Sequence, residues 1–184
     1  MSLRVLLAQS SGSCEAVVSS FLAARACAIT RVASIESVQR ALESARFEAI
    51  FLDLALSLDD CLRLLESIAT QPAMPALFVI ASSEPAQVGF RLAQLGVRAV
   101  LREPIDAHTL ARVWCDVLGK PPDLRPLVRS SVGLIGMRKI EGQVRAEMIA
   151  EALARSQGSR RGAAAMLEIS RQLLQHIVRN GDDP

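Results

Sequence analysis

The chain has 184 residues, of which 51% are hydrophobic and 22% charged, and its formal net charge is +2. These proportions are typical of a globular domain with a buried core and exclude a disordered chain. No apolar run reaches the roughly 18 residues of a membrane span, and the apolar run near the N-terminus is too short for a signal peptide. We therefore expect a cytoplasmic protein that does not contact a membrane.

Residues 1–118 alternate between short apolar runs and stretches with helical spacing. Apolar residues at i, i+3, i+4 and i+7 follow each run and are typical of helices that cover a sheet. Strands that are apolar almost throughout favour a parallel sheet buried on both faces. The fold class that this predicts is α/β, a doubly wound five-stranded parallel sheet. The predicted strands are residues 3–8, 28–32, 49–52, 76–80 and 99–101.

The last third of the chain differs in composition and charge. Glycine and prolines begin a stretch that we expect to be a linker over 119–140. Residues 141–184 predict a small all-α domain, with helices near 143–156, 160–167 and 170–179, the last two capped by Ser159 and Ser170. Residues 1–118 hold 10 basic and 12 acidic side chains, whereas residues 119–184 hold 11 and 7. This basic excess indicates a polyanionic partner.

Cysteines and histidines give no sign of a metal or redox centre. The two histidines, His108 and His176, are far apart in the sequence, and no CxxC pair occurs. We expect reduced thiols, no metal and no cofactor. The sequence also lacks a nucleophile elbow, a P-loop and an acid/base pair, so we do not expect an enzyme. The four cysteines are Cys14, Cys27, Cys61 and Cys115.

Four features of the first domain occur together in a known family. Asp53 ends the third predicted strand, Leu95 and Gly96 precede the fifth, and Glu103 and Pro104 follow it. Residues 3 to about 118 thereby resemble the receiver domain of response regulators. The resemblance implies that Asp53 holds the position of the phosphoryl acceptor. It also implies a Mg²⁺ held by an acidic pair after the first strand and a lysine before the proline.

The sequence departs from this pattern at the residues that the chemistry needs. Gln9 and Ser10 occupy the positions of the acidic pair, and Glu103 occupies that of the lysine. A carboxylate about 4 Å from a phosphoryl group costs several kcal/mol. We therefore expect a degenerate receiver without Mg²⁺-dependent phosphorylation, in which Asp53 caps backbone amides. The other departures are Ile80 at the hydroxyl position (with Ser82 nearby), Val100 at the aromatic position, and Ser57 and Cys61 in the loop after Asp53.

Two further surfaces of this domain are open to more than one interpretation. Residues 9–13, QSSGS, fit an anion-binding loop at a helix N-terminus, but short hydroxyl-rich loops that enter helices are more often plain caps and turns. In the receiver family, the fourth and fifth helices form a common dimer surface. On that resemblance Val88, Phe90, Arg91 and Arg112 are interface candidates, although Val88 fits the core equally well.

Residues 145–179 resemble the Fis-type helix-turn-helix, which implies binding to double-stranded DNA. The last helix would lie in the major groove, with Arg171 as the best candidate for a base or phosphate contact. The other predicted DNA-binding residues are Gln172 and Gln175 toward bases, and His176, Arg179, Arg160 and Arg161 toward phosphates. The resemblance rests on Ala152, Leu153, Gly158, Ala163, Ala164, Leu167, Ile169, Ser170, Arg171 and Leu174.

Glu168 stands where this family usually has a glycine, and it adds a negative charge near the DNA-facing side. Three short helices bury too little surface to be stable alone, so we expect a homodimer that reads a pseudo-palindromic site. The leading hypothesis is a transcription regulator whose receiver domain dimerises or binds a signalling protein. The alternatives are a scaffold protein whose tail does not bind DNA, and a regulator that is phosphorylated at an unconventional site.

Overall fold

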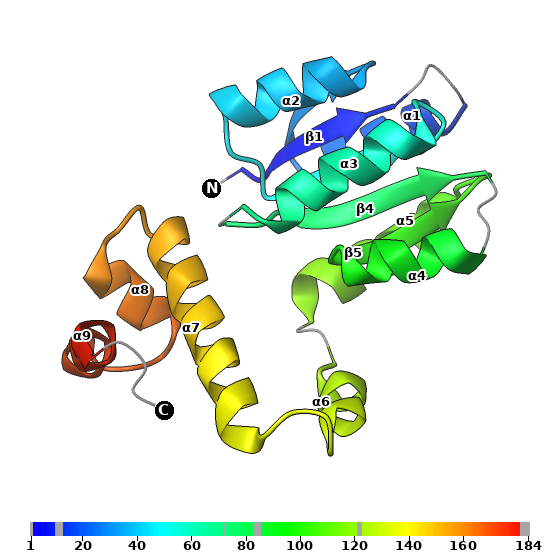
Figure 1. Ribbon diagram of the computed structural model, residues 1–184. Coiled ribbons are helices and arrows are strands. Elements are labelled where there is room, and N and C mark those ends of the chain that lie inside the picture. The colour runs from blue at the N-terminus through cyan, green and yellow to red at the C-terminus, as the bar shows by residue number, and fades with distance from the viewer. Residues whose placement is uncertain (1, 10–12, 72, 83–85, 121–122, 181–184) are drawn as a thin grey trace. The chain divides into compact units, whose positions relative to one another are not determined.

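The computed structural model describes residues 2–9, 13–71, 73–82, 86–120 and 123–180 (Figure 1). The chain divides into two compact units, Met1–Pro122 and Asp123–Pro184. None of the described helices combines the length and the apolar character needed to cross a membrane.

The N-terminal unit contains a five-stranded parallel sheet in the order β2-β1-β3-β4-β5. This confirms the predicted doubly wound α/β class. The central strands are buried on both faces, because Phe51 packs into one hydrophobic cluster while its neighbours Ile50 and Leu52 pack into the other. The strands are β1 (Arg4–Ala8), β2 (Ala28–Val32), β3 (Ala49–Asp53), β4 (Ala76–Ala81) and β5 (Val97–Arg102).

Helices cover both faces of this sheet. Residues of α1 (Ser13–Ala23) and α5 (Ala107–Gly119) complete the cluster that contains Phe51. Residues of α2 (Ile35–Ser44), α3 (Leu58–Ala69) and α4 (Ala86–Gln94) complete the opposite cluster. The layered arrangement brings the carboxyl ends of the strands to one edge, where ligand sites of such folds lie.

An aromatic stack forms the centre of the first cluster. The rings of Phe51 and Phe78 lie 4.5 Å apart between centroids, and Trp114 of α5 stacks on both, at 6.2 and 5.8 Å. Phe21 of α1 meets Trp114 edge to face at 5.8 Å. The single tryptophan of the chain therefore reports on the packing of α5 against the sheet.

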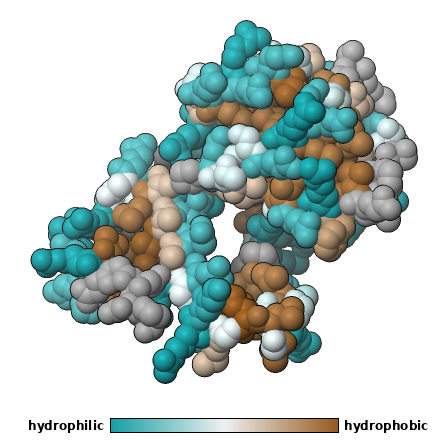
Figure 2. All heavy atoms as spheres, viewed as in Figure 1, coloured by the Kyte–Doolittle hydropathy of each residue, from teal (hydrophilic) through white to brown (hydrophobic). Residues whose placement is uncertain are grey.

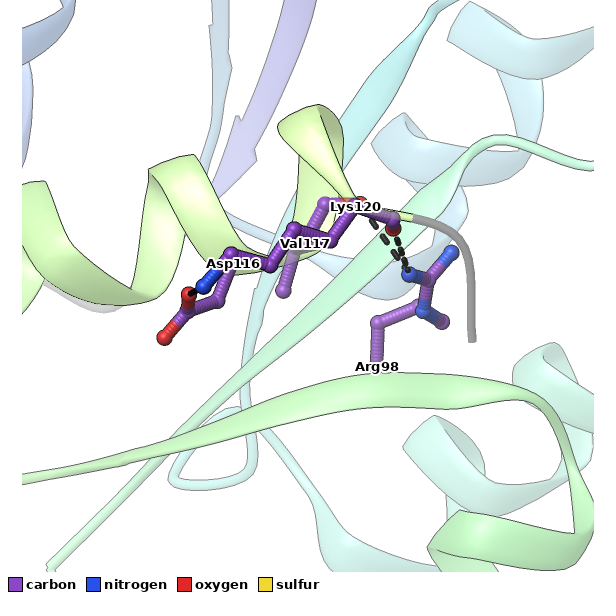
Figure 3. A network of polar contacts seen from close by, with 4 residues as sticks. All are labelled: Arg98, Asp116, Val117 and Lys120. Atoms are coloured by element: carbon purple, nitrogen blue, oxygen red, sulfur yellow. Dashed lines mark hydrogen bonds and ion pairs between the residues drawn. The ribbon is translucent and has the colours of Figure 1, made fainter. Parts of the chain in front are cut away.

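The end of α5 is fixed to β5 by an arginine. The guanidinium of Arg98 donates hydrogen bonds to the carbonyl oxygens of Val117 (3.1 Å) and Lys120 (3.2 Å), while the Lys120 ammonium pairs with Asp116 at 2.6 Å (Figure 3). At its other end, α5 is capped by Asp106, whose carboxylate accepts the Thr109 amide hydrogen bond at 2.8 Å.

The C-terminal unit is entirely helical in its described part. It comprises α6 (Arg125–Ser131), α7 (Met137–Arg155), α8 (Arg160–Met166) and α9 (Arg171–Asn180). Its small core joins α7, α8 and α9 through Ala152, Ala163, Ala164 and Leu174. Alanines at the contact of α7 with α8 let the two helices approach closely.

The stretch 119–140, which the sequence predicts as a linker, is helical in part. Gly119 ends α5, α6 lies inside this stretch, and α7 begins at Met137. Proline did not prevent α6, because Pro126 lies in the first turn, where its missing N–H has no helical partner to lose. The helices predicted near 160–167 and 170–179 are α8, which ends at Met166, and α9, which begins at Arg171.

Candidate functional site

Asp53 lies at the carboxyl end of the central strand β3 and is only 5% exposed. Its Oδ1 accepts a hydrogen bond from the Ala55 amide at 2.9 Å. Its carbonyl oxygen accepts bonds from the Leu56 amide at 3.2 Å and from the Cys61 thiol at 3.5 Å. The side-chain carboxylate and the backbone carbonyl of Asp53 thus both stabilise the turn from β3 into α3.

Cys61 lies in the first turn of α3 and is fully buried. Burial is the main cause that raises the pKa of its thiol to about 11, and the nearby charges of Asp53 and Asp60 act in the same direction. The thiol is therefore protonated at neutral pH and available as the donor to the Asp53 carbonyl.

Three of the residues that the sequence predicts to depart from the receiver pattern lie near this edge of the sheet in the described part of the chain. Gln9, just after β1, is 5% exposed, and its Oε1 has no hydrogen-bond partner among the described residues. Ile80 is paired with Asp53 in the sheet register and is fully buried. Glu103 follows β5 and is half-buried, with its amide bonded to the Ala81 carbonyl at 3.1 Å. Ser10 and part of the 9–13 loop lie outside the described residues.

The donor set at this edge does not fit Mg²⁺. This ion prefers oxygen ligands that include carboxylates, in near-octahedral geometry. Gln9 supplies a neutral amide, and one carboxylate oxygen of Asp53 is already bonded to Ala55. Within the described part of the chain, no three His, Cys, Asp or Glu side chains gather into a group able to hold a metal ion.

The candidate interface residues on α4 and α5 divide into two kinds. Val88 is half-buried and packs against the sheet, whereas Phe90 is 69% exposed. Arg91 forms a close ion pair with Glu66 of α3, and Arg112 is exposed on α5. Phe90 is thus the large apolar side chain that this surface offers to a partner.

The α8–α9 segment of the C-terminal unit holds the predicted DNA-binding residues. Ser159 caps α8 by accepting the Gly162 amide hydrogen bond at 3.2 Å. Arg160 and Arg161 are exposed in the first turn of α8. Ser170 accepts the Leu173 amide bond at 3.1 Å at the start of α9. Between the two helices, Glu168 has a φ of 54°, the left-handed conformation that favours glycine.

One face of α9 is polar, and Leu174 on the opposite side is buried. Leu174 is fully buried in the small core, while a shallow hollow of about 240 Å³ is lined by Gln172, Gln175, His176 and Arg179. The structure therefore brings these four predicted residues together. Arg171 is exposed at the start of α9 but does not line the hollow, and Arg160 and Arg161 lie on α8.

A feature that the sequence reasoning missed is an apolar groove within the C-terminal unit. Its volume is about 990 Å³, and residues of α6, α7 and α9 and of the turn before α9 line it. The signal was present in the spacing of Leu124, Leu127 and Val128 at i, i+3 and i+4, but the neighbouring prolines pointed to a linker.

Comparisons with known proteins place the N-terminal unit in a fold class. No protein-family model matches the sequence, and a search of curated proteins found no match. Among solved structures, the chemotaxis response regulator CheY4 of Vibrio cholerae is 18% identical, with a TM-score of 0.57 over 64% of this chain and all of that chain. The N-terminal unit therefore has the receiver, or CheY-like, fold.

Two other solved structures give the same result. The receiver domain of the Pseudomonas aeruginosa sensor histidine kinase PA1611, solved with a magnesium ion in its active site cleft, is 20% identical, with a TM-score of 0.55 over 65% of this chain and all of that chain. The receiver domain of Saccharomyces cerevisiae Ssk1, in a co-crystal with the histidine phosphotransfer protein Ypd1, is 15% identical, with a TM-score of 0.54 over 63% of this chain and 88% of that chain. At these identities the likeness concerns the fold alone.

Proposed function

We propose that this chain is a cytoplasmic, DNA-binding transcription regulator of the response-regulator type and not an enzyme. The observation that carries the proposal is the two-sided character of α9. Leu174 anchors one side in the core, and Gln172, Gln175, His176 and Arg179 share the polar hollow on the other. A short helix that packs against the core on one side and presents amide and guanidinium groups on the other is suited to binding in the major groove.

The residues around α9 support a division of labour in DNA binding. In a Fis-type helix-turn-helix, α8 would cross the backbone while α9 enters the groove. Arg171, exposed in the first turn of α9, is the candidate for a bidentate contact with guanine. Arg160 and Arg161 sit at the N-terminus of α8, where amides and side-chain charge both favour phosphate.

The receiver-fold unit, in this proposal, works without Mg²⁺-dependent phosphorylation. Gln9 offers a neutral amide where a metal needs a carboxylate, and Glu103 adds a negative charge that would repel a phosphoryl group. Asp53 would instead stabilise the β3–α3 turn through its bond to the Ala55 amide. The unit would act as a dimerisation or partner-binding module. The Ypd1–Ssk1 complex supports a signalling protein as its partner, because it is a protein complex of a receiver domain of the same fold.

A homodimer completes the proposal. Four residues make up the buried apolar core of the described part of the C-terminal unit, which is too little for a stable domain alone. A two-fold dimer would set two α9 helices on successive major grooves, and the target would be a pseudo-palindromic duplex.

Selection from a random duplex library with the full chain tests the DNA-binding claim. Enrichment of a two-fold symmetric sequence is expected. Arg171→Ala should weaken binding to the selected duplex by about 1–3 kcal/mol and relax the base preference at one position of each half-site. No enrichment, with a folded dimer, would instead support the scaffold alternative.

Incubation of the chain with acetyl phosphate and Mg²⁺, followed by intact-mass measurement, tests the receiver claim. The expected result is no phosphoryl adduct. An adduct that Asp53→Asn abolishes would mean that an unconventional phosphorylation site operates.

A further inference from the structure

The side-chain amide oxygen of Gln9 is a buried hydrogen-bond acceptor that the surrounding protein does not satisfy. Gln9 directly follows β1 and is only 5% exposed, and its Oε1 has no partner in the described part of the chain. A buried acceptor without a hydrogen bond destabilises a fold. A ligand that donates a hydrogen bond to this atom is therefore stabilised at this position.

The sheet register places Gln9 beside Asp53. Leu7 and Phe51 are a register pair of β1 and β3, and both belong to the hydrophobic cluster under α1 and α5. The Gln9 amide continues the β1–β2 ladder by donating to the Val32 carbonyl at 3.2 Å. Because side chains alternate between the two faces of a sheet, Gln9 and Asp53, two residues further along, lie on neighbouring strands and on that same face.

A second carboxylate lies at this edge, on the same face. Glu103 follows the buried Leu101 of that cluster by two residues, and its amide still donates to a carbonyl of β4 at 3.1 Å. Between the two carboxylates, Ile80 is fully buried and offers no hydrogen-bonding group. The described side chains at this edge thus combine two negative charges, on Asp53 and Glu103, with the acceptor of Gln9.

The chemistry of these groups selects one class of ligand. Two carboxylates repel a phosphate or any other anion. Mg²⁺ fits poorly, because the amide of Gln9 stands where this ion needs a further carboxylate. A primary ammonium group has a positive charge and three N–H donors but no acceptor, so it complements a site made of acceptors and negative charge.

We infer that this edge of the receiver-fold unit binds a protonated primary amine, which donates hydrogen bonds to Oε1 of Gln9 and to the carboxylate of Asp53 while Glu103 adds negative charge. Asp53 can accept this bond in addition to that of the Ala55 amide, since a carboxylate has about four acceptor positions. The inference rests on the proposed function in one respect, that this unit works without Mg²⁺-dependent phosphorylation.

Nuclear magnetic resonance titration of the full chain with n-butylammonium chloride tests this inference, with the ionic strength held constant. The reporters are the side-chain amide of Gln9 and the backbone amide of Ala55, which donates to Asp53. Both resonances should shift and reach saturation. Tetramethylammonium has the same charge but no N–H donor, so it should produce no saturable shift.

Variants identify the groups that bind the amine. Gln9→Met keeps the length of the side chain but removes the acceptor, and it should raise the dissociation constant for n-butylammonium, read from the Ala55 amide, by at least about 10-fold. Asp53→Asn should have an effect of the same size, read from the Gln9 amide. Glu103→Gln acts through charge alone and should weaken binding by about 3-fold.

Matched controls make the same substitutions at exposed positions. Gln39→Met lies on α2, whose outer surface is mostly hydrophilic (Figure 2), and Asp59→Asn lies in the first turn of α3. Both should leave the affinity for n-butylammonium unchanged.

Thermal unfolding gives a readout that does not depend on the resonances. Without amine, Gln9→Met should raise the melting temperature, because a buried unpaired acceptor is replaced by an apolar group. Adding n-butylammonium should raise the melting temperature of the wild type, since the ligand binds the folded chain, but not that of Gln9→Met. Far-UV circular dichroism checks that each variant is folded.

Each outcome supports or overturns the inference. Saturable shifts that tetramethylammonium does not reproduce, and that Gln9→Met and Asp53→Asn weaken, support it. Absent shifts, equal shifts with tetramethylammonium, or an unchanged affinity in Gln9→Met overturn it. If acetyl phosphate and Mg²⁺ also give no phosphoryl adduct, the proposed receiver function survives that failure; an adduct on Asp53 overturns both.

The amine has two sources, a free alkylamine and a lysine side chain of a partner protein. Nα-acetyl-lysine methylamide, which carries the lysine ammonium between two peptide groups, separates them. Affinity equal to that of n-butylammonium supports the inference with a lysine side chain as ligand. Affinity lower by about 10-fold or more supports it with a free amine, because the flanking peptide groups then hinder access.

Discussion

The guanidinium of Arg98 in β5 lies 3.2 Å from the carbonyl oxygen of Lys120, the last described residue of the N-terminal unit (Figure 3). The same group bonds the Val117 carbonyl at 3.1 Å. The last carbonyls of a helix lack partners within the helix, and a cation near them is favourable for the helix dipole. Arg98 therefore fixes the end of α5 from which the chain leaves the receiver fold.

Removal of this contact should loosen the last turn of α5. We expect Arg98→Ala to lower the free energy of unfolding of the N-terminal unit by about 1–2 kcal/mol, because two hydrogen bonds are lost. Amide hydrogen exchange should become faster at the end of α5 and stay unchanged in β1. Arg63→Ala, which removes an exposed ion pair with Asp60, is the control. Equal effects of both substitutions would show that Arg98 does not hold the helix end.

The aromatic stack should dominate the stability of the N-terminal unit. Phe78 is fully buried and its ring stacks on those of Phe51 and Trp114, so Phe78→Ala should lower the free energy of unfolding by about 3–5 kcal/mol through lost burial and a cavity. Urea unfolding followed by Trp114 fluorescence measures this loss. The control Phe90→Ala removes a ring that is 69% exposed and should change the stability by less than about 0.5 kcal/mol. A small effect of Phe78→Ala would mean that the stack is not tightly packed.

The raised pKa of Cys61 predicts alkaline sensitivity. Its pKa in the folded chain is about 11, compared with an ordinary value near 9. Below pH 9 the thiol is therefore protonated in both the folded and the unfolded chain, and its ionisation does not change the free energy of unfolding. Between pH 9 and 11 the unfolded thiol ionises while the folded one does not, and stability should fall by at most about 3 kcal/mol. Unfolding of Cys61→Ala, measured at both pH values, should lack this component. An equal slope in wild type and variant would contradict the assignment.

Glu168 should limit both stability and DNA affinity. Glu168→Gly relieves the positive φ, worth about 1 kcal/mol, and removes a negative charge beside α9. We expect a higher melting temperature and tighter DNA binding. Glu168→Gln keeps the backbone strain and removes the charge, so it should tighten DNA binding without the gain in stability. If neither substitution changes DNA binding, the turn does not face the nucleic acid.

The sheet could be predicted from the sequence because its central strands are buried on both faces and therefore appear as continuous apolar runs, such as residues 49–52. The polar hollow on α9 could be anticipated in part, since Gln172, Gln175, His176 and Arg179 recur at helical spacing. Contacts between residues distant in sequence could not: the Arg98 bond to Lys120 depends on how α5 lies beside β5. The groove and α6 could not be predicted because prolines favour a linker there, whereas Pro126 lies in the first turn of α6, where a proline is compatible with a helix.

The most direct test of the DNA-binding proposal is the salt dependence of binding to the selected duplex, measured for the wild type and for Arg171→Ala. Neutralised phosphates release counterions, so the logarithm of the association constant should fall linearly with the logarithm of salt concentration. We expect a steep slope for both proteins, slightly smaller for the variant, with sequence preference lost only in the variant. Binding that is absent, or independent of salt and of Arg171, would contradict a DNA-binding regulator.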